Sequence, residues 1–143
     1  MRKFALAAIA AGIAWVFVPS AGTVAAQYSR LTPMVTSCSP PTNDCKASRA
    51  SYMRDYERAL KADLNAMRSV AHCLKTGCLS AVHVDEVASC AWRKLVILEH
   101  PAKATDHDRD LADKRCNRDL PYATDRHIAE QLVLDFSRLR KTK

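Results

Sequence analysis

Residues Met53–Gly77 read MRDYERALKADLNAMRSVAHCLKTG, and this stretch decides the fold class. Its apolar side chains recur at steps of three and four residues, which places them on one face of an α-helix. Gly77 ends the pattern, because glycine readily takes the left-handed conformation found at helix ends. We therefore predict one long helix from about Ala47 to Thr76. Its apolar face comprises Met53, Tyr56, Leu60, Leu64, Met67, Ala71 and Leu74.

Three more helices are predicted downstream. The second runs from about Val84 to Leu98 on the same periodicity. The third begins at Thr105, where Asp108 three residues on resembles a capping arrangement. The fourth runs from about Asp125 to Leu139. No segment shows sustained β alternation, so the sequence predicts an all-α domain of about four helices in two antiparallel helical hairpins over residues 47–140.

The first 26 residues have the layout of a secretory signal peptide. Arg2 and Lys3 precede an uninterrupted apolar run, Phe4 to Val18, and small residues follow up to Ala26. We expect cleavage near Ala26 and a periplasmic or secreted product. An uncleaved membrane anchor is the alternative, although Pro19 and its polar neighbours interrupt the span. Residues 27–46 are rich in Pro, Ser and Thr and are expected to form an extended lead-in.

Export governs how the cysteines are interpreted. All six lie after the expected cleavage point, and an even number in an oxidising compartment favours disulfides over free thiols. If the first two predicted helices fold back on each other near residues 81 and 82, Cys73 and Cys90 are almost equally far from the turn, so we predict that they pair. That leaves Cys78 for Cys116 and Cys38 for Cys45.

The charge of the chain argues against a nucleic-acid partner. The formal net charge is +7. It falls to about +5 when Arg2 and Lys3 leave with the signal, and no aromatic side chains interleave with the charges of the basic C-terminal end. The last six residues, RLRKTK, form a basic end, with residues 141–143 as its tip. A solvated terminus and a surface that binds a polyanion both remain open for this end.

Metal, redox and hydrolytic chemistry find little support in the motifs. His72, Cys73, Cys78, His83 and Cys90 could supply zinc ligands, but an exported protein normally oxidises such thiols. Neither C-x-x-C nor C-x-x-C-H occurs, and neither do G-x-S-x-G, H-E-x-x-H or a glycine-rich phosphate loop. His107 between two aspartates is better explained as part of a solvated helix start. We therefore expect no catalytic, cofactor-binding or metal-binding residues.

A family resemblance rests on residues of the first two predicted helices. The positions are Ala66, Val70, Ala71, Gly77, Asp85, Ser89, Trp92 and Lys94, and together they resemble the Sel-one-like repeat, a relative of the tetratricopeptide repeat. The resemblance covers Ala66 to Val96. It implies a helical hairpin in which a small residue lets the helices touch, a glycine turns the chain and an aspartate opens the second helix. In the cysteine-rich secreted type it also implies a disulfide between the two helices, and a scaffold that binds other proteins, commonly in bacterial envelopes.

These observations lead to an expected function. We expect a small exported helical scaffold that binds another envelope or secreted protein and carries out no catalysis. An inhibitor or modulator of an extracellular enzyme is the alternative, with the Cys38–Cys45 loop as the contacting element. A small hydrolase is the third. No nucleic acid is expected as a partner, and a membrane only if the signal is uncleaved.

Overall fold

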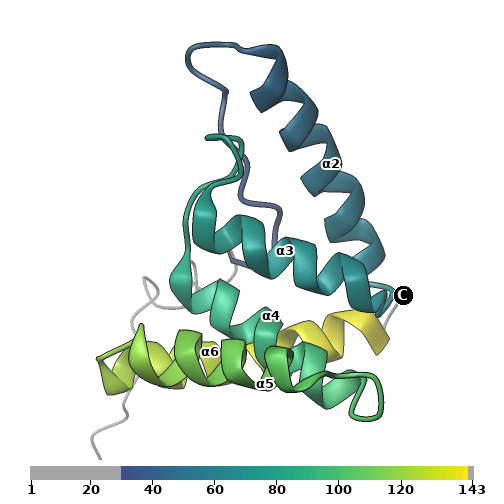
Figure 1. The fold of residues 1–143 in the computed structure, drawn as a ribbon, viewed down its shortest axis with the longest axis vertical. Helices are drawn as coiled ribbons and strands as arrows, with labels where there is room; N and C mark the ends of the chain where they lie inside the picture. The colour runs from purple at the N-terminus through teal and green to yellow at the C-terminus, as the bar shows by residue number, and fades with distance from the viewer. Residues whose placement is uncertain (1–29, 142–143) are drawn as a thin grey trace, which may run out of the picture.

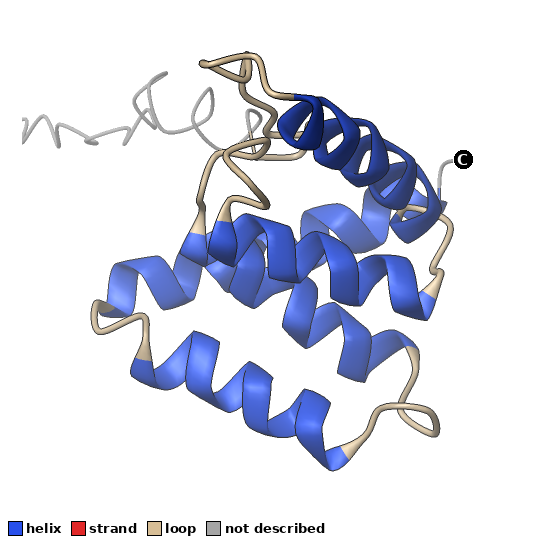
Figure 2. Cartoon of the chain, turned by 45° about the horizontal axis from the view of Figure 1, so that its top comes forward, coloured by secondary structure: helices blue, strands red, loops and turns tan. Residues whose placement is uncertain are grey.

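In the computed structural model, residues 30–141 form a helical domain with no strand among them. The signal peptide predicted for residues 1–26 lies outside the described residues. Figures 1 and 2 show the arrangement of the helices. They are α2 (Asn43–Ala59), α3 (Leu64–Thr76), α4 (Glu86–Glu99), α5 (Asp106–Asp113) and α6 (Ala123–Lys141), with a short π-helical segment, η1 (Lys114–Arg118), after α5. None of the helices in the described part is both long enough and apolar enough to cross a membrane.

The all-α prediction is confirmed, but the described chain has five α-helices where about four were expected. The single long helix predicted up to Thr76 is in fact α2 and α3, separated by a tight turn. Ala62 takes a left-handed conformation with φ of 61°, and Asp63 caps the new helix by accepting a hydrogen bond from the Ala66 backbone N–H. The apolar spacing runs through this turn without a glycine or a proline, so the periodicity concealed the break.

The pair α3 and α4 is an antiparallel hairpin at the centre of the fold (Figure 1). Gly77 ends α3 with φ of 78°, as the sequence predicted. Asp85 caps α4 by accepting from the Ala88 N–H. The Ser89 hydroxyl donates to the Ala71 carbonyl at 2.8 Å, which holds the two backbones close. Ala71 is fully buried at this contact, so the small residue allows the approach.

The C-terminal half does not repeat this arrangement. The expected capping box is present at α5, where the Thr105 and Asp108 side chains bond each other's backbone N–H groups. α6, however, makes most of its contacts with α4 instead of folding back on α5. α4 therefore packs against α3, α5, η1 and α6. A helix surrounded in this way buries every residue from Val87 to Arg93.

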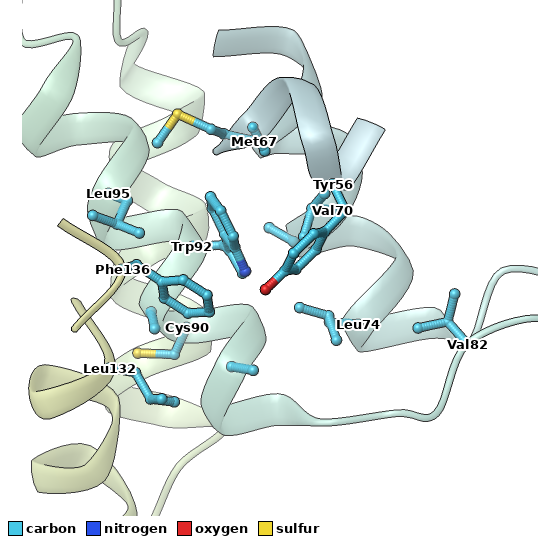
Figure 3. Packing of buried hydrophobic residues seen from close by; sticks show 14 of the residues in the cluster. Tyr56, Met67, Val70, Leu74, Val82, Cys90, Trp92, Leu95, Leu132 and Phe136 are labelled. Carbon is cyan, nitrogen blue, oxygen red and sulfur yellow. The ribbon is translucent and has the colours of Figure 1, made fainter. Parts of the chain in front are cut away.

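Trp92 is the centre of the core (Figure 3). Its fully buried indole meets Tyr56 of α2 edge-on, with ring centroids 5.8 Å apart, and lies 4.5 Å from the Phe136 ring of α6. Aromatic pairs at these separations add to the stabilisation that comes from burial. Three helices that are distant in the sequence are joined through this one side chain.

The lead-in lies along the turn between α3 and α4. Val35 and Val82 form an isolated antiparallel bridge. The Thr36 N–H donates to the Ala81 carbonyl at 2.9 Å, and the His83 N–H donates to the Met34 carbonyl at 2.8 Å. The lead-in is thus fastened to the α3–α4 hairpin before α2 begins at Asn43, a few residues earlier than expected.

Candidate functional site

The described part of the chain contains three disulfides. They join Cys38 to Cys45, Cys73 to Cys78 and Cys90 to Cys116, with Cα–Cα distances of 5.8, 4.9 and 5.1 Å. The first is the pair that the sequence favoured. The other two correct the predicted pairs, Cys73 with Cys90 and Cys78 with Cys116. Three disulfides are compatible with an oxidising, extracellular type of compartment.

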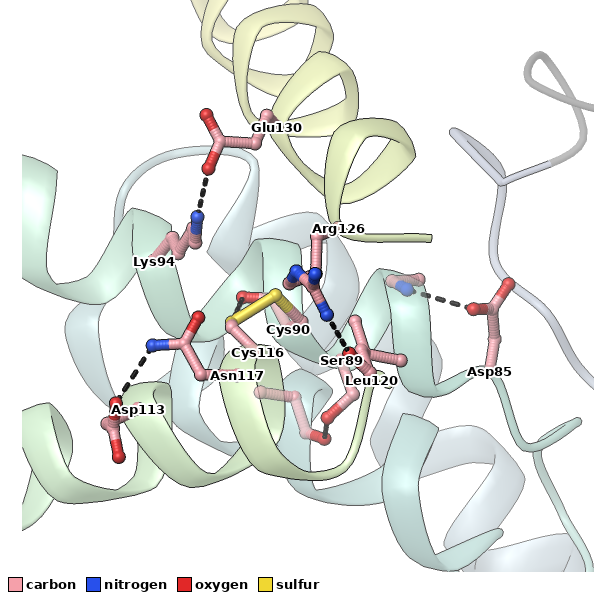
Figure 4. The surroundings of a disulfide bond; sticks show 12 residues. Asp85, Ser89, Cys90, Lys94, Asp113, Cys116, Asn117, Leu120, Arg126 and Glu130 are labelled. Carbon is pink, nitrogen blue, oxygen red and sulfur yellow. Dashed lines mark hydrogen bonds and ion pairs between the residues drawn. A yellow bond between two sulfur atoms is a disulfide. The ribbon is translucent and has the colours of Figure 1, made fainter. Parts of the chain in front are cut away.

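The corrected pairing follows from the direction in which the side chains point. In the α3–α4 hairpin it is Ser89 that faces α3, and Cys90 is turned about 100° further round the helix. Cys90 therefore points at η1, where it meets Cys116 (Figure 4). Cys78 follows Gly77, and the left-handed turn there brings Cys78 back to Cys73, at a sequence separation of 5. Equal distance from a turn was not sufficient, because the side chains must also face each other.

The zinc ligands considered in the sequence are not brought together. Every cysteine is in a disulfide. No group of three or more His, Cys, Asp or Glu side chains in the described part is arranged to hold a metal ion. His72 and His83 are both exposed, at opposite ends of the Gly77 turn.

A cleft of about 840 Å³ is bounded by α2, α3, α4, the start of α5 and η1. Its lining mixes hydroxyl, imidazole, carboxylate and guanidinium groups, with the half-buried Cys73–Cys78 disulfide at one edge. We call this feature the arginine cleft. Its charged and imidazole side chains are Asp55, Arg68, His72, Arg93, His107, Asp108 and Arg115.

An ion pair of defined geometry crosses the arginine cleft. Arg68 Nε donates to Asp108 Oδ1 at 2.9 Å and its terminal nitrogen donates to Oδ2 at 2.6 Å. The same Oδ2 also accepts from the backbone N–H and the hydroxyl of Thr105, at 2.8 and 2.9 Å. Asp108 is 2% exposed, so a fixed charge pair ties α3 to the first turn of α5.

The hydrogen bonds from Arg68 hold the pKa of the Asp108 carboxyl well below its usual range, although burial opposes them and the bonds from Thr105 assist. A carboxyl with a depressed pKa in the folded state stabilises the protein above its unfolded pKa of about 4, and this contribution is lost as the pH falls below that value. Asp108→Asn should therefore cost about 1–3 kcal/mol near pH 7 and flatten the dependence of stability on pH between 7 and 3.

Urea unfolding at both pH values measures this effect. Asp110→Asn, on the same helix, is the matched control, since it removes the same charge and no ion pair to Asp110 occurs within the described residues. A drop in stability between pH 7 and 3 as large in Asp108→Asn as in the wild type would contradict the assignment.

Arg93 is the side chain that sequence reasoning missed. It belongs to α4, is 8% exposed, lines the cleft, and its Nε has no hydrogen-bond partner within the described part. Burial lowers the pKa of the Arg93 guanidinium; Asp108 opposes this, and Arg115 and Arg68 add to it. A signal was present in the sequence, because Val87 to Trp92 contains no charged residue and such a segment is typical of a helix buried on all sides.

Two further hollows lie elsewhere on the described surface. One, of about 620 Å³, lies between α4 and α6 around the exposed Leu98 and Leu134, with the Lys94–Glu130 ion pair at its edge (Figure 4). The other lies beside Arg140. Arg140, from the predicted basic end, is paired with Glu99, so this part of the end is anchored to α4.

Comparison with family models, with curated proteins and with solved structures finds no match.

Proposed function

We propose that this protein is an exported, non-catalytic helical scaffold that binds another envelope or secreted protein in the arginine cleft. The observation that carries the proposal is the cleft itself. Four helices and η1 contribute to its walls, and it holds polar side chains from each of them. Its volume of about 840 Å³ is large enough for a segment of a partner.

The supporting framework suits this role. The Cys73–Cys78 bridge lies at the edge of the cleft, and Cys90–Cys116 ties α4 to η1 behind it. A surface held in one shape before binding loses less conformational freedom when the partner arrives. The resemblance of Ala66–Val96 to the Sel-one-like repeat, a protein-binding type of repeat, also supports the proposal.

Site-specific photo-crosslinking tests the proposal. A benzophenone side chain in place of His107, an exposed residue of the cleft, should capture one dominant protein from envelope extract or culture medium. The same group in place of Tyr122, which is 69% exposed and lies outside the cleft, is the control and should not capture it. An identical set of products from the two positions, or no product at all, would contradict binding in the cleft.

An inhibitor of an extracellular enzyme is the second candidate, and one observation favours it. The Cys38–Cys45 bridge closes a short loop in which every residue from Ser39 to Asp44 is exposed. A closed, exposed loop is suited to enter the active site of another protein. Replacing Pro41 and Thr42 with glycines should then abolish inhibition of the target enzyme while the helical content is kept, and unchanged inhibition would exclude the loop.

A further inference from the structure

The lining of the arginine cleft carries three arginines and two carboxylates, Asp55 and Asp108, which leaves one positive charge in excess. Asp55 forms an ion pair with Arg58, outside the cleft. Arg68 forms an ion pair with Asp108. Arg115 forms an ion pair with Asp119, the residue that follows η1. The Nε of Arg93 is buried and has no hydrogen-bond partner within the described part, and Arg93 takes part in none of the ion pairs found there. Among the three arginines of the cleft, Arg93 is therefore the one whose charge is left over.

The carboxylate with the largest electrostatic effect on Arg93, Asp108, accepts its hydrogen bonds from other residues. Asp108 acts electrostatically on Arg93. Its Oδ1 accepts from Arg68, and its Oδ2 accepts from Arg68 and twice from Thr105. A carboxylate oxygen has about two lone-pair positions, so Oδ2 has no accepting capacity to spare. Asp108 moderates the field around Arg93 without serving as its hydrogen-bond partner.

A buried guanidinium nitrogen without a hydrogen-bond partner, such as the Nε of Arg93, is unfavourable for the protein alone. Charged groups that lose most of their water are normally paired, because their desolvation is otherwise uncompensated. Arg93 is 8% exposed, and it opens onto the cleft instead of onto the apolar core. A ligand that supplies a negative charge and acceptor oxygens would compensate this desolvation, and water supplies no such charge.

We propose that Arg93 is the receptor for a side-chain carboxylate, from an aspartate or glutamate in a segment of the partner that lies in the arginine cleft. The charge count favours a carboxylate, since one unmatched positive charge is balanced by one negative charge. The planar fork of a guanidinium matches the two oxygens of a carboxylate. The Ser51 and Ser69 hydroxyls line the same cleft and can donate to the segment beside it.

The shape of the cleft favours an internal segment over a free small acid. Its walls extend from α2 to η1, and about 840 Å³ is far more than one carboxylate fills. A chain that lies across the cleft places a side chain over Arg93 while its backbone contacts the walls. This inference rests on the proposed function for the nature of the partner, whereas the carboxylate site itself stands on the environment of Arg93.

The test uses ¹⁵N-labelled protein and follows the Nε–Hε signal of Arg93 by NMR. The probes are acetate, inorganic phosphate, and two capped tripeptides, acetyl-Gly-Glu-Gly-amide and acetyl-Gly-Gln-Gly-amide. The glutamate peptide should give a saturable shift with an affinity roughly ten- to hundredfold above that of the glutamine peptide, as expected for a charge-assisted hydrogen bond. Acetate should shift the same signal more weakly. Equal responses to the two peptides, or saturation by phosphate alone, would overturn the proposal.

Variants provide the second measurement. Arg93→Met keeps an unbranched side chain similar to the aliphatic part of arginine. It should abolish discrimination between the two peptides while raising the midpoint of thermal unfolding, because an uncompensated buried charge has been removed. Arg54→Met, which removes an exposed arginine of α2 outside the cleft, should change neither. A lowered midpoint in Arg93→Met together with unchanged discrimination would show that Arg93 is structural, and would overturn the assignment.

The failure of this proposal can be told apart from failure of the proposed function. If the protein discriminates between the two peptides but captures no partner from position 107, the carboxylate site is supported and the proposed protein partner is contradicted. If position 107 captures a partner and Arg93→Met does not change this capture, the scaffold function is supported and the carboxylate site is contradicted.

Discussion

Trp92→Ala should lower the free energy of unfolding by about 3–5 kcal/mol, the cost typical of removing a large buried aromatic side chain. The indole is fully buried and contacts Tyr56 and Phe136, so its loss opens a cavity between α2, α4 and α6 at once. Small domains are often stable by only about 5–15 kcal/mol, so the variant is expected to be close to unfolding. Urea denaturation followed by circular dichroism measures the change.

Two further variants make this result interpretable. Trp92→Phe keeps an aromatic ring, and it removes no hydrogen bond because the indole N–H has no partner within the described part. It should therefore cost much less than Trp92→Ala. Leu98→Ala, at a position of the same helix that is 63% exposed, should stay within about 0.5 kcal/mol of the wild type. Similar losses for Trp92→Ala and Leu98→Ala would contradict the central place given to Trp92.

The double variant Cys90→Ala, Cys116→Ala should be less stable than the wild type by roughly 3.5 kcal/mol. The bridge spans a sequence separation of 26 residues, and the chain-entropy treatment of cross-links gives about this value for such a loop. Both cysteines are buried, at 0% and 3% exposure, so lost packing adds to the effect. Without the bridge, η1 is no longer tied to α4, and the wall of the cleft that carries Arg115 should loosen.

The Cys73–Cys78 pair offers a matched comparison. Its separation is 5 residues, for which the same treatment gives roughly 2 kcal/mol, and both cysteines are only partly buried. The double variant Cys73→Ala, Cys78→Ala should therefore lose less stability. The opposite order of the two losses in urea unfolding would contradict the view that Cys90–Cys116 is the principal cross-link of the fold.

Local signals predicted the helices well where the chain marks its own boundaries. Gly77 ends α3 as expected, and Thr105 with Asp108 caps α5 as expected. The turn at Ala62 was missed because apolar spacing continues through it, and Asp63 became recognisable as a cap only once the break was known. The spacing of apolar residues shows which face of a helix is apolar. A short turn that keeps the apolar residues on the same face does not interrupt this spacing, so the spacing does not reveal the turn.

The candidate site was less accessible to prediction. The arginine cleft gathers Arg68, Arg93 and Arg115 from three separate elements, and none of the three belongs to a local motif. The stretch without charges before Arg93 could have suggested a central helix. This stretch could not have shown that Arg93 would lack a hydrogen-bond partner at its Nε. That outcome depends on the folded structure, in which Asp108 accepts its hydrogen bonds from Arg68 and Thr105.

By itself, the sequence determined the helical class, the principal helix ends and an even set of cysteines suited to an oxidising compartment, because each depends on periodicity, capping residues or composition. Only the tertiary structure decided that α6 packs on α4, that Cys90 meets Cys116 and that the Nε of Arg93 is buried without a hydrogen-bond partner. These features depend on the direction in which a side chain points once helices have packed. A rotation of about 100° along a helix separates Cys90 from the face of Ser89, and no spacing in the sequence states which of the two faces meets which neighbour.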